Sequence, residues 1–201
     1  TQIGDAIEGE YNKDYSGIST SLSSDGSIVA IGAHGNEPSN RGHVRIYQNV
    51  NNEWEKIGDD IDGEAAWDNF GRSVSLSSDG SVVAIGAHAN NGNGPDSGHV
   101  RIFQNVNGTW KQAGNDIYGK AIDDRSGLSV SLSSDGSIVA IGSPNNDDNG
   151  EDSGLVRVYQ IDLDETAPSI QGPSGDAGDS TSSKSISENS TAVHTFSSNE
   201  T

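Results

Sequence analysis

The stretch VSLSSDGSVVAIGAH, residues 74–88, decides the fold, because nearly the same residues occur once before it and once after it. An Asp-Gly-Ser triplet marks each copy, beginning at Asp25, Asp79 and Asp135, so successive copies lie 54 and 56 residues apart. Self-similarity at a fixed period of roughly this size indicates a solenoid, a propeller or an array. The chain is therefore a repeat protein.

The composition limits the class of protein and its partners. Of 201 residues only 30% are hydrophobic, and 26 are glycine, which predicts a thin, distributed core and many tight turns. We expect almost no helix. A formal charge of −19 argues against binding to nucleic acid or to anionic membranes and favours cations or simple solubility. The sequence has no cysteine for disulfides or thiolate sites and no run of 18 apolar residues for direct membrane insertion.

Each repeat predicts the same series of short strands. An Asp-x-x-Gly corner precedes a first strand, and a Ser-Ser-Asp-Gly turn connects it to a second strand in a hairpin. A third strand follows a polar loop, and a fourth carries Trp54 or Trp110. Four antiparallel strands in each unit are typical of a β-propeller blade. We therefore expect an all-β fold with propeller blades at residues 1–54, 55–110 and 111–161, part of a larger ring.

The composition changes after residue 161. Residues 162–184 are rich in Ser, Thr and Gly and predict a linker, and residues 185–201 predict the truncated first strand of another β domain. The chain also begins inside a repeat without an initiator Met. We expect a piece of a longer protein that has further blades or domains.

Three segments of the second repeat resemble the FG-GAP repeat of integrin α-chain propellers. They are Phe-Gly-x-Ser-Val at residues 70–74, Val-Ala-Ile-Gly-Ala at 83–87, and Gly-His-Val-Arg-Ile-Phe at 98–103. The resemblance implies an extracellular adhesion module. Some blades of that family hold calcium between their first two strands, but the loop here is too short to wrap an ion. Asp25, Asp79 and Asp135 are therefore interpreted as turn formers.

The C-terminal segment resembles a second family. Asp-Leu-Asp-Glu-Thr-Ala-Pro at residues 162–168 and Ser-Ile-Ser-Glu-Asn at 185–189 are similar to the linker and opening strand of bacterial cadherin-like domains. In that family acidic residues at these places hold calcium between neighbouring domains. The resemblance therefore gives Asp164 and Glu188 a calcium-ligating role.

Two loops between second and third strands also carry candidate Ca²⁺ ligands. Alternating side-chain oxygens with a Gly at the turn suit a hard cation that takes six to eight oxygens. The alternative is a solvated turn without an ion. The candidate ligands are Asn91, Asn93 and Asp96 in the second repeat and Asp147, Asn149 and Asp152 in the third.

The remaining conspicuous residues favour binding over catalysis. Because His34, His43, His88 and His99 form repeat-equivalent pairs, they are interpreted as structural. Trp67 lies outside the repeat pattern and is a candidate contact for carbohydrate or protein. Three arginines recur in the third strands and are expected to bridge to the Asp-x-x-Gly corners; these are Arg45, Arg101 and Arg157. No catalytic triad, acid–base pair, phosphate loop or zinc spacing is present, which argues against an enzyme.

These observations predict a non-catalytic adhesion or binding module of a large secreted or surface protein, with calcium stabilisation as a further expectation. Its expected partners are protein or carbohydrate ligands at a cell surface. Two alternatives stay open: a substrate-presenting appendage of an extracellular hydrolase, and a structural spacer.

Overall fold

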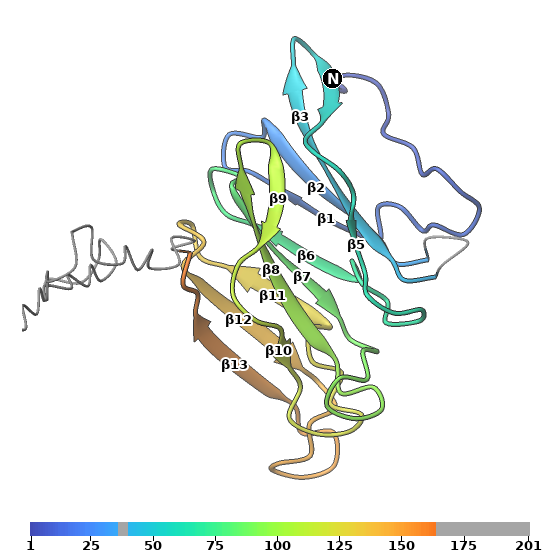
Figure 1. The fold of residues 1–201 in the computed structure, drawn as a ribbon, viewed down its shortest axis with the longest axis vertical. Helices are drawn as coiled ribbons and strands as arrows, with labels where there is room; N and C mark the ends of the chain where they lie inside the picture. Colours follow the sequence, from blue (N-terminus) through green and yellow to red (C-terminus); the bar gives the residue numbers. More distant parts are fainter. Residues whose placement is uncertain (36–39, 164–201) are drawn as a thin grey trace, which may run out of the picture. The chain divides into compact units, whose positions relative to one another are not determined.

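The computed structural model describes residues 1–35 and 40–163, and residues 1–163 form one compact unit. Every regular element in this part of the chain is a β-strand (Figure 1), as the sequence predicts. None of its elements is a helix long and apolar enough to cross a membrane. The predicted linker after Leu163 and the cadherin-like strand, with Asp164 and Glu188, lie outside the described residues.

Three antiparallel sheets follow one another along the chain. The first has the order β1-β2-β3-β4 with β5 also on β3, the second has β10-β8-β7-β6 with β9 also on β8, and the third has β11-β12-β13. The strands are β1 (Ser19–Leu22), β2 (Ile28–Ala33), β3 (His43–Val50), β4 (Glu53–Lys56), β5 (Ile61–Asp62), β6 (Ser73–Leu76), β7 (Val82–Ala87), β8 (His99–Val106), β9 (Thr109–Gln112), β10 (Ile117–Tyr118), β11 (Ser129–Leu132), β12 (Ile138–Ser143) and β13 (Leu155–Gln160). We call the sheets the first, second and third blade.

The outer edge of a blade is divided between two segments. The second half of β3 pairs with β4, whereas His43 and Val44 at its start pair with β5, on the way to the next blade. The second blade repeats this arrangement with β9 and β10 on β8. The predicted fourth strand is therefore β4 or β9, and the first and second blades each gain a two-residue strand that the sequence did not predict, whereas the third blade has three strands among the described residues.

The Asp-Gly turns fix the register of each inner hairpin. Asp79 Oδ1 accepts hydrogen bonds from Ser77 Oγ, Ser81 N and Ser81 Oγ at 2.7–3.0 Å, and Gly80 takes a φ of 72°. Asp25 and Asp135 make the same bonds. The interpretation of these three aspartates as turn formers is confirmed. Ser73 consequently pairs with Gly86, and Ser19 and Ser129 pair with their equivalents Gly32 and Gly142.

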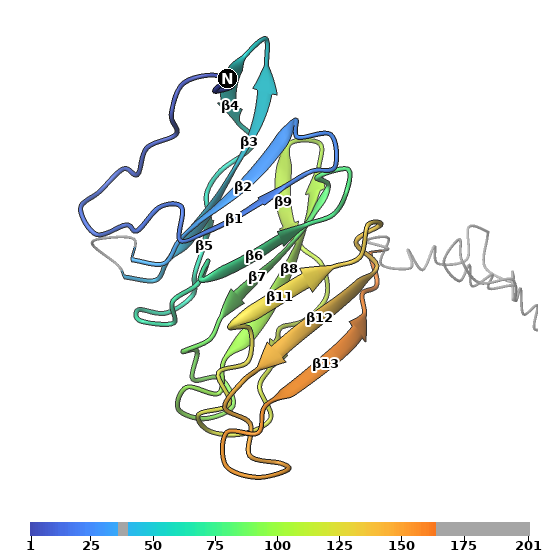
Figure 2. The same ribbon diagram turned by 180° about the vertical axis from the view of Figure 1, so that it is seen from behind.

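The blades pack through their inner strands β1, β6 and β11, which lie side by side (Figure 2). Ser19 Oγ donates to Gly71 O and Ser73 Oγ donates to Gly127 O, both at 2.7 Å. The approach is so close that a Cβ on Gly32 or Gly86 would lie 2.0 Å from these carbonyl oxygens. Glycine is thus required at both positions for contact between neighbouring blades.

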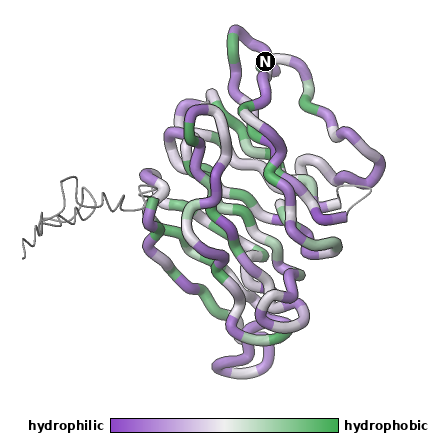
Figure 3. The backbone as a smooth tube through the Cα atoms, viewed as in Figure 1, coloured by the Kyte–Doolittle hydropathy of each residue, from purple (hydrophilic) through white to green (hydrophobic). Residues whose placement is uncertain are grey.

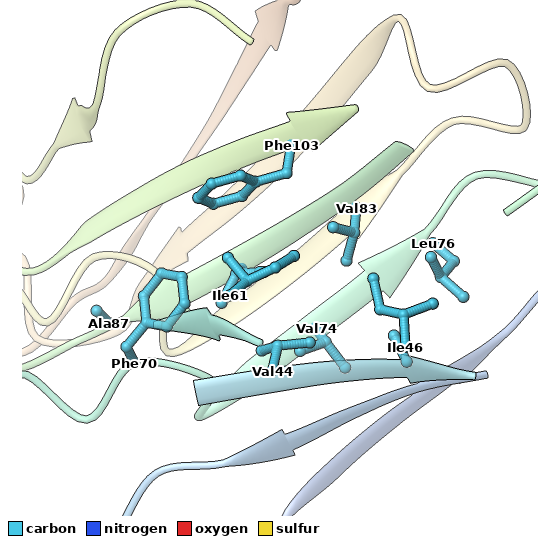
Figure 4. Close-up of a cluster of buried hydrophobic side chains, with 11 residues drawn as sticks. Val44, Ile46, Ile61, Phe70, Val74, Leu76, Val83, Ala87 and Phe103 are labelled. Carbon is cyan, nitrogen blue, oxygen red and sulfur yellow. The ribbon is translucent and has the colours of Figure 1, made fainter. Parts of the chain in front are cut away.

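The hydrophobic core is divided between the two blade interfaces, with hydrophobic residues along the strands and hydrophilic ones in the loops (Figure 3). At the first interface Val44 and Ile46 of β3 face Phe70, Val74 and Leu76 of the second blade (Figure 4). The second interface uses the equivalent Val100 and Ile102. The first half of β3, residues 43–46, is buried on both faces because it packs on the neighbouring blade.

Candidate binding surface

The Asp-x-x-Gly corners form a constant frame at the start of each blade. Asp14, Asp68 and Asp124 are each only 2% exposed. Asp124 Oδ2 accepts bonds from the backbone N–H groups of Lys120 and Ala121, both at 2.9 Å, and its Oδ1 accepts from Asn146 Nδ2. Asn90 makes the equivalent bond to Asp68 at 2.7 Å. In the first blade Asp14 Oδ2 accepts from the backbone N–H groups of Glu10 and Tyr11, while its Oδ1 has no hydrogen-bond partner among the described residues. Since all three carboxylates are buried, they hold the corners and are closed to a ligand from solvent.

The residues on either side of each corner Asp have left-handed backbone conformations. Their φ angles lie between 52° and 72° at the three corners, with Tyr15 at 53° and Trp67 at 72°. Non-glycine residues rarely adopt this conformation, and it directs neighbouring side chains away from a regular strand. The exposed pairs differ in chemistry from blade to blade: Lys13 and Tyr15, Trp67 and Asn69, Asp123 and Arg125.

A pocket of about 210 Å³ lies where the first two corners meet. Its lining consists of Lys13, Tyr15, His34, Gly35, Asn40, Trp67 and Asn69. Tyr15 stacks on His34 with ring centroids 5.0 Å apart, and the backbone N–H of Trp67 donates to Asn40 O at 2.7 Å. Trp67 is nevertheless 70% exposed and Tyr15 is 57% exposed. Two large aromatic side chains are thus held by the backbone while their rings remain open to solvent, an arrangement suited to a ligand.

Basic side chains without an acidic partner lie in and around the first corners. Lys13, Arg72 and Arg125 form no ion pair with any described residue. Burial, together with Arg72, lowers the pKa of His34, and burial with Arg72 and Arg125 lowers the pKa of His88 to about 4. Both imidazoles are therefore neutral at pH 7.

The predicted calcium loops lie between β7 and β8 and between β12 and β13. Asn91 Oδ1 accepts from Asp96 N at 2.9 Å, and Asp147 Oδ1 accepts from Asp152 N at 2.7 Å, so each loop closes on itself. Asn93 donates through Nδ2 to Gly119 O. Asn149 is exposed. These bonds hold the turns without an ion, and calcium binding at either loop stays a prediction.

One cluster of possible metal ligands has a different role. Oxygen and nitrogen atoms of Glu64, His99 and Asp116 lie within 4.8 Å of one another. However, the Arg101 guanidinium lies 3.6 Å from both carboxylates, where it supplies the positive charge that a cation would bring. Gln112 and Tyr118 also donate to the two oxygens of Asp116 at 2.7 and 3.0 Å. The cluster is a polar network around Arg101 and does not suit a metal ion.

The burial of His99 agrees with this interpretation. Its Nδ1 lies 3.5 Å from Asp116 Oδ2 but has no hydrogen-bond partner. Burial lowers the pKa of His99 to about 4, against the opposing effect of Asp116. The imidazole is therefore neutral at pH 7, and its contact with Asp116 is not an ion pair. His43 and His99 are each 1% exposed, so both pack in the interior. This burial supports the interpretation that the two histidines have a structural role.

The predicted bridges between strand arginines and corner aspartates are wrong. Arg45 pairs at 2.8 Å with Glu10, four residues before Asp14, and Arg101 approaches the equivalent Glu64. Arg157 instead donates to Tyr118 O and Ser126 Oγ. The corner carboxylates are buried, and Asp68 and Asp124 accept from Asn side chains, whereas the arginines bind the segment that precedes each corner.

The two repeat-equivalent tryptophans anchor the segment that enters each blade. Trp54 Nε1 donates to Ile3 O and Trp110 Nε1 donates to Ile57 O, both at 3.0 Å. They are thus structural, unlike Trp67. The grouping of Tyr15 with Trp67 could not be found from the sequence, because they lie 52 residues apart in different repeats and meet only through the packing of two blades.

The comparisons with known proteins agree with this repeat architecture. Residues 60–103 match the FG-GAP repeat, so the resemblance of the second repeat is confirmed. Such repeats are found in extracellular adhesion-type proteins. No curated protein matches the chain.

Two solved structures show the same fold at low sequence identity. KlAtg21, solved in complex with the coiled coil of AgAtg16, is 12% identical with a TM-score of 0.50 over 72% of this chain and 39% of its own. A candidate 6-phosphogluconolactonase from Bacteroides uniformis is 15% identical with a TM-score of 0.50 over 73% of this chain and 37% of its own. The chain thus spans well under half the length of these structures, and the likeness concerns the β-propeller fold alone.

Proposed function

We propose that this chain is a non-catalytic binding module that acts outside the cell, and that it contacts its ligand through the Tyr15–Trp67 pocket. The observation that carries this proposal is the contrast within the corners. The buried aspartates and the backbone are the same in each blade, whereas the exposed side chains beside them differ in charge, size and hydrogen-bonding capacity. Folding alone needs no such variety on exposed positions.

The ligand class follows from the pocket itself. A volume of about 210 Å³ is smaller than a typical drug-sized site and fits a single sugar ring or a single side chain. Exposed Trp and Tyr rings offer flat apolar faces, while Lys13 and the amides of Asn40 and Asn69 offer polar contacts at the rim. We therefore propose a surface carbohydrate or a protein loop as the ligand. Stabilisation by calcium at the β7–β8 and β12–β13 loops is a separate proposal.

The test is a binding screen with the 201-residue chain on glycan and protein arrays. We expect saturable binding that Trp67→Ala and Tyr15→Ala each weaken at least tenfold, because each removes one ring of the pocket. Ile122→Ala is the matched control, since Ile122 is an apolar loop residue that is 59% exposed and lies outside the pocket. Binding that survives both aromatic substitutions would place the ligand elsewhere, and silence on both arrays would favour the spacer.

The appendage alternative makes a different prediction. A module that presents substrate to a hydrolase should bind the polymer which that enzyme cleaves and should show no preference among cell-surface proteins. Binding confined to one soluble polysaccharide on the array would therefore support the appendage over the adhesion module.

A further inference from the structure

Trp67 and Asn69 lie between two blade interfaces. On the side of the first blade they line the pocket together with Lys13 and Tyr15. The step of 54 residues between the first two repeats makes them the equivalents of Lys13 and Tyr15, so toward the third blade they hold the same places at the second interface. The indole of Trp67 is 70% exposed. A ligand that contacts this ring therefore has a second interface on its other side.

The backbone of the second interface is built like that of the first. Trp67 N donates to Asn40 O at 2.7 Å, which fixes the second corner against the β2–β3 loop. Arg125 N donates to Asp96 O at 3.0 Å, which fixes the third corner against the β7–β8 loop. Arg125 has a φ of 52°, close to the 59° of its equivalent Asn69. The third corner thus presents its side chains beside the second blade as the second corner does beside the first.

The side chains at the second interface are polar and unpaired. Burial has the largest effect on the pKa of His88, and Arg72 and Arg125 lower it further. Asp96 has the opposite effect. These three charges therefore lie near the imidazole. Arg72 and Asp96 are half-buried, whereas Asp123 and Arg125 are exposed. None of the four side chains forms a hydrogen bond or an ion pair within the part of the chain that the structure describes.

This mixture of groups suits a ligand that is rich in hydroxyls. A hydroxyl both donates and accepts hydrogen bonds, so it pairs with a guanidinium, a carboxylate or a neutral imidazole. A ligand of one charge would be attracted by the arginines or the aspartates and repelled by the other pair. A sugar carries its hydroxyls around an apolar ring face, and the exposed indole of Trp67 is a flat partner for that face.

We propose that the second interface is a second subsite, and that the ligand is a neutral oligosaccharide that spans both subsites across Trp67. This inference rests on the proposed function, because it extends the Tyr15–Trp67 pocket. Packed sheets lie about 10 Å apart, so equivalent positions of neighbouring blades are separated by roughly this distance. One sugar ring fills the pocket of about 210 Å³, whereas a chain of linked rings also reaches the next interface. The second subsite consists of Arg72, His88, Asp96, Asp123 and Arg125.

The test is isothermal titration calorimetry of the full chain with sugars of increasing length. The probes are glucose, mannose and galactose, and their β-1,4-linked oligosaccharides of two to four rings. For at least one of these sugars, affinity should rise at least tenfold between the single ring and the longest chain. Arg125→Ala should remove this rise and leave binding of the single ring unchanged, because Arg125 lies outside the pocket. Trp67→Ala should weaken binding at every length.

Two further variants control the charge and the fold. Lys111→Ala also removes a positive charge from an exposed side chain, but on β9, and should keep the wild-type affinity at every length. Arg125→Asn places at the third corner the residue that the second corner already has in a left-handed conformation, Asn69. It should fold as the wild type does, which circular dichroism checks, and should lose the rise with length because its side chain is shorter.

The outcomes separate the second subsite from the pocket. Trp67-dependent affinity that does not change with chain length, or a rise that survives both substitutions of Arg125, overturns the second subsite and leaves the pocket in place. Binding of a protein through Trp67, with no response to any of these sugars, overturns the oligosaccharide and leaves the proposed binding module intact. Silence toward the sugars and on both arrays removes the proposed function, and this inference with it.

Discussion

Adding one methyl group at Gly86 should separate the second and third blades. The new Cβ of Gly86→Ala would lie 2.0 Å from Gly127 O and 2.4 Å from Ser73 Oγ. The oxygen belongs to the backbone and cannot rotate away, so the corner of the third blade must move. That movement would also break the bond of 2.7 Å from Ser73 Oγ to the same oxygen.

The magnitude follows from three contributions. Overpacking by a methyl group costs about 1–3 kcal/mol, and the lost hydrogen bond costs about 1 kcal/mol. The reduced freedom of the unfolded chain returns about 0.4–1 kcal/mol. We therefore expect a loss of roughly 2–3 kcal/mol in the free energy of unfolding, which for a chain of this length lowers Tm by roughly 4–12 °C.

Gly142→Ala is the matched control, because the same methyl group there approaches only Ser129 Oγ, a side-chain atom that can rotate. Both variants should be measured by urea unfolding and calorimetry. Equal losses at Gly86 and Gly142 would refute the reasoning, since the contact with a following blade would then contribute nothing measurable.

Three further perturbations test the corners, the histidines and the loops. Asn146→Ala should cost about 1–3 kcal/mol in urea unfolding, because the buried Asp124 loses its side-chain donor; an unchanged midpoint would contradict this. His88 has a pKa lowered to about 4, so the unfolded chain binds more protons below pH 6.5 and stability should fall from pH 6.5 towards 4. His88→Gln should reduce that slope, and an unchanged slope would exclude His88 as a contributor. Millimolar CaCl₂ should give titration heat and a higher Tm that Asp147→Asn with Asp152→Asn abolishes, and no response in the wild type would remove calcium from both loops.

The sequence predicted the inner part of each blade because local signals determine it. The Asp-Gly turn at Asp79 sets a hairpin whose two strands both lie within residues 73–87. Repetition of the same residues then predicted that the hairpin recurs. Local turn chemistry and a period were sufficient for these elements.

The outer edges and the candidate site depend on contacts between repeats. β5 contains only Ile61 and Asp62, and its pairing with β3 arises because the chain must pass along that strand to reach the next blade. Arg45 pairs with Glu10 across 35 residues, and no local pattern distinguishes Glu10 from the other acidic residues. Likewise, Tyr15 meets Trp67 only because two corners pack together. Such partners meet only in the tertiary structure, and no short stretch of the sequence identifies them.

The left-handed backbone at the corners separates recognition from folding. Any non-glycine residue at the position of Trp67 meets a similar backbone penalty, and the buried Asp beside it satisfies the turn regardless of which side chain points outward. A different side chain at the position before the corner Asp, such as Trp or Asp in place of Lys, therefore leaves the architecture intact and changes the chemistry of the exposed surface. A protein built this way can acquire new ligands through single substitutions, one corner at a time, without first gaining spare stability.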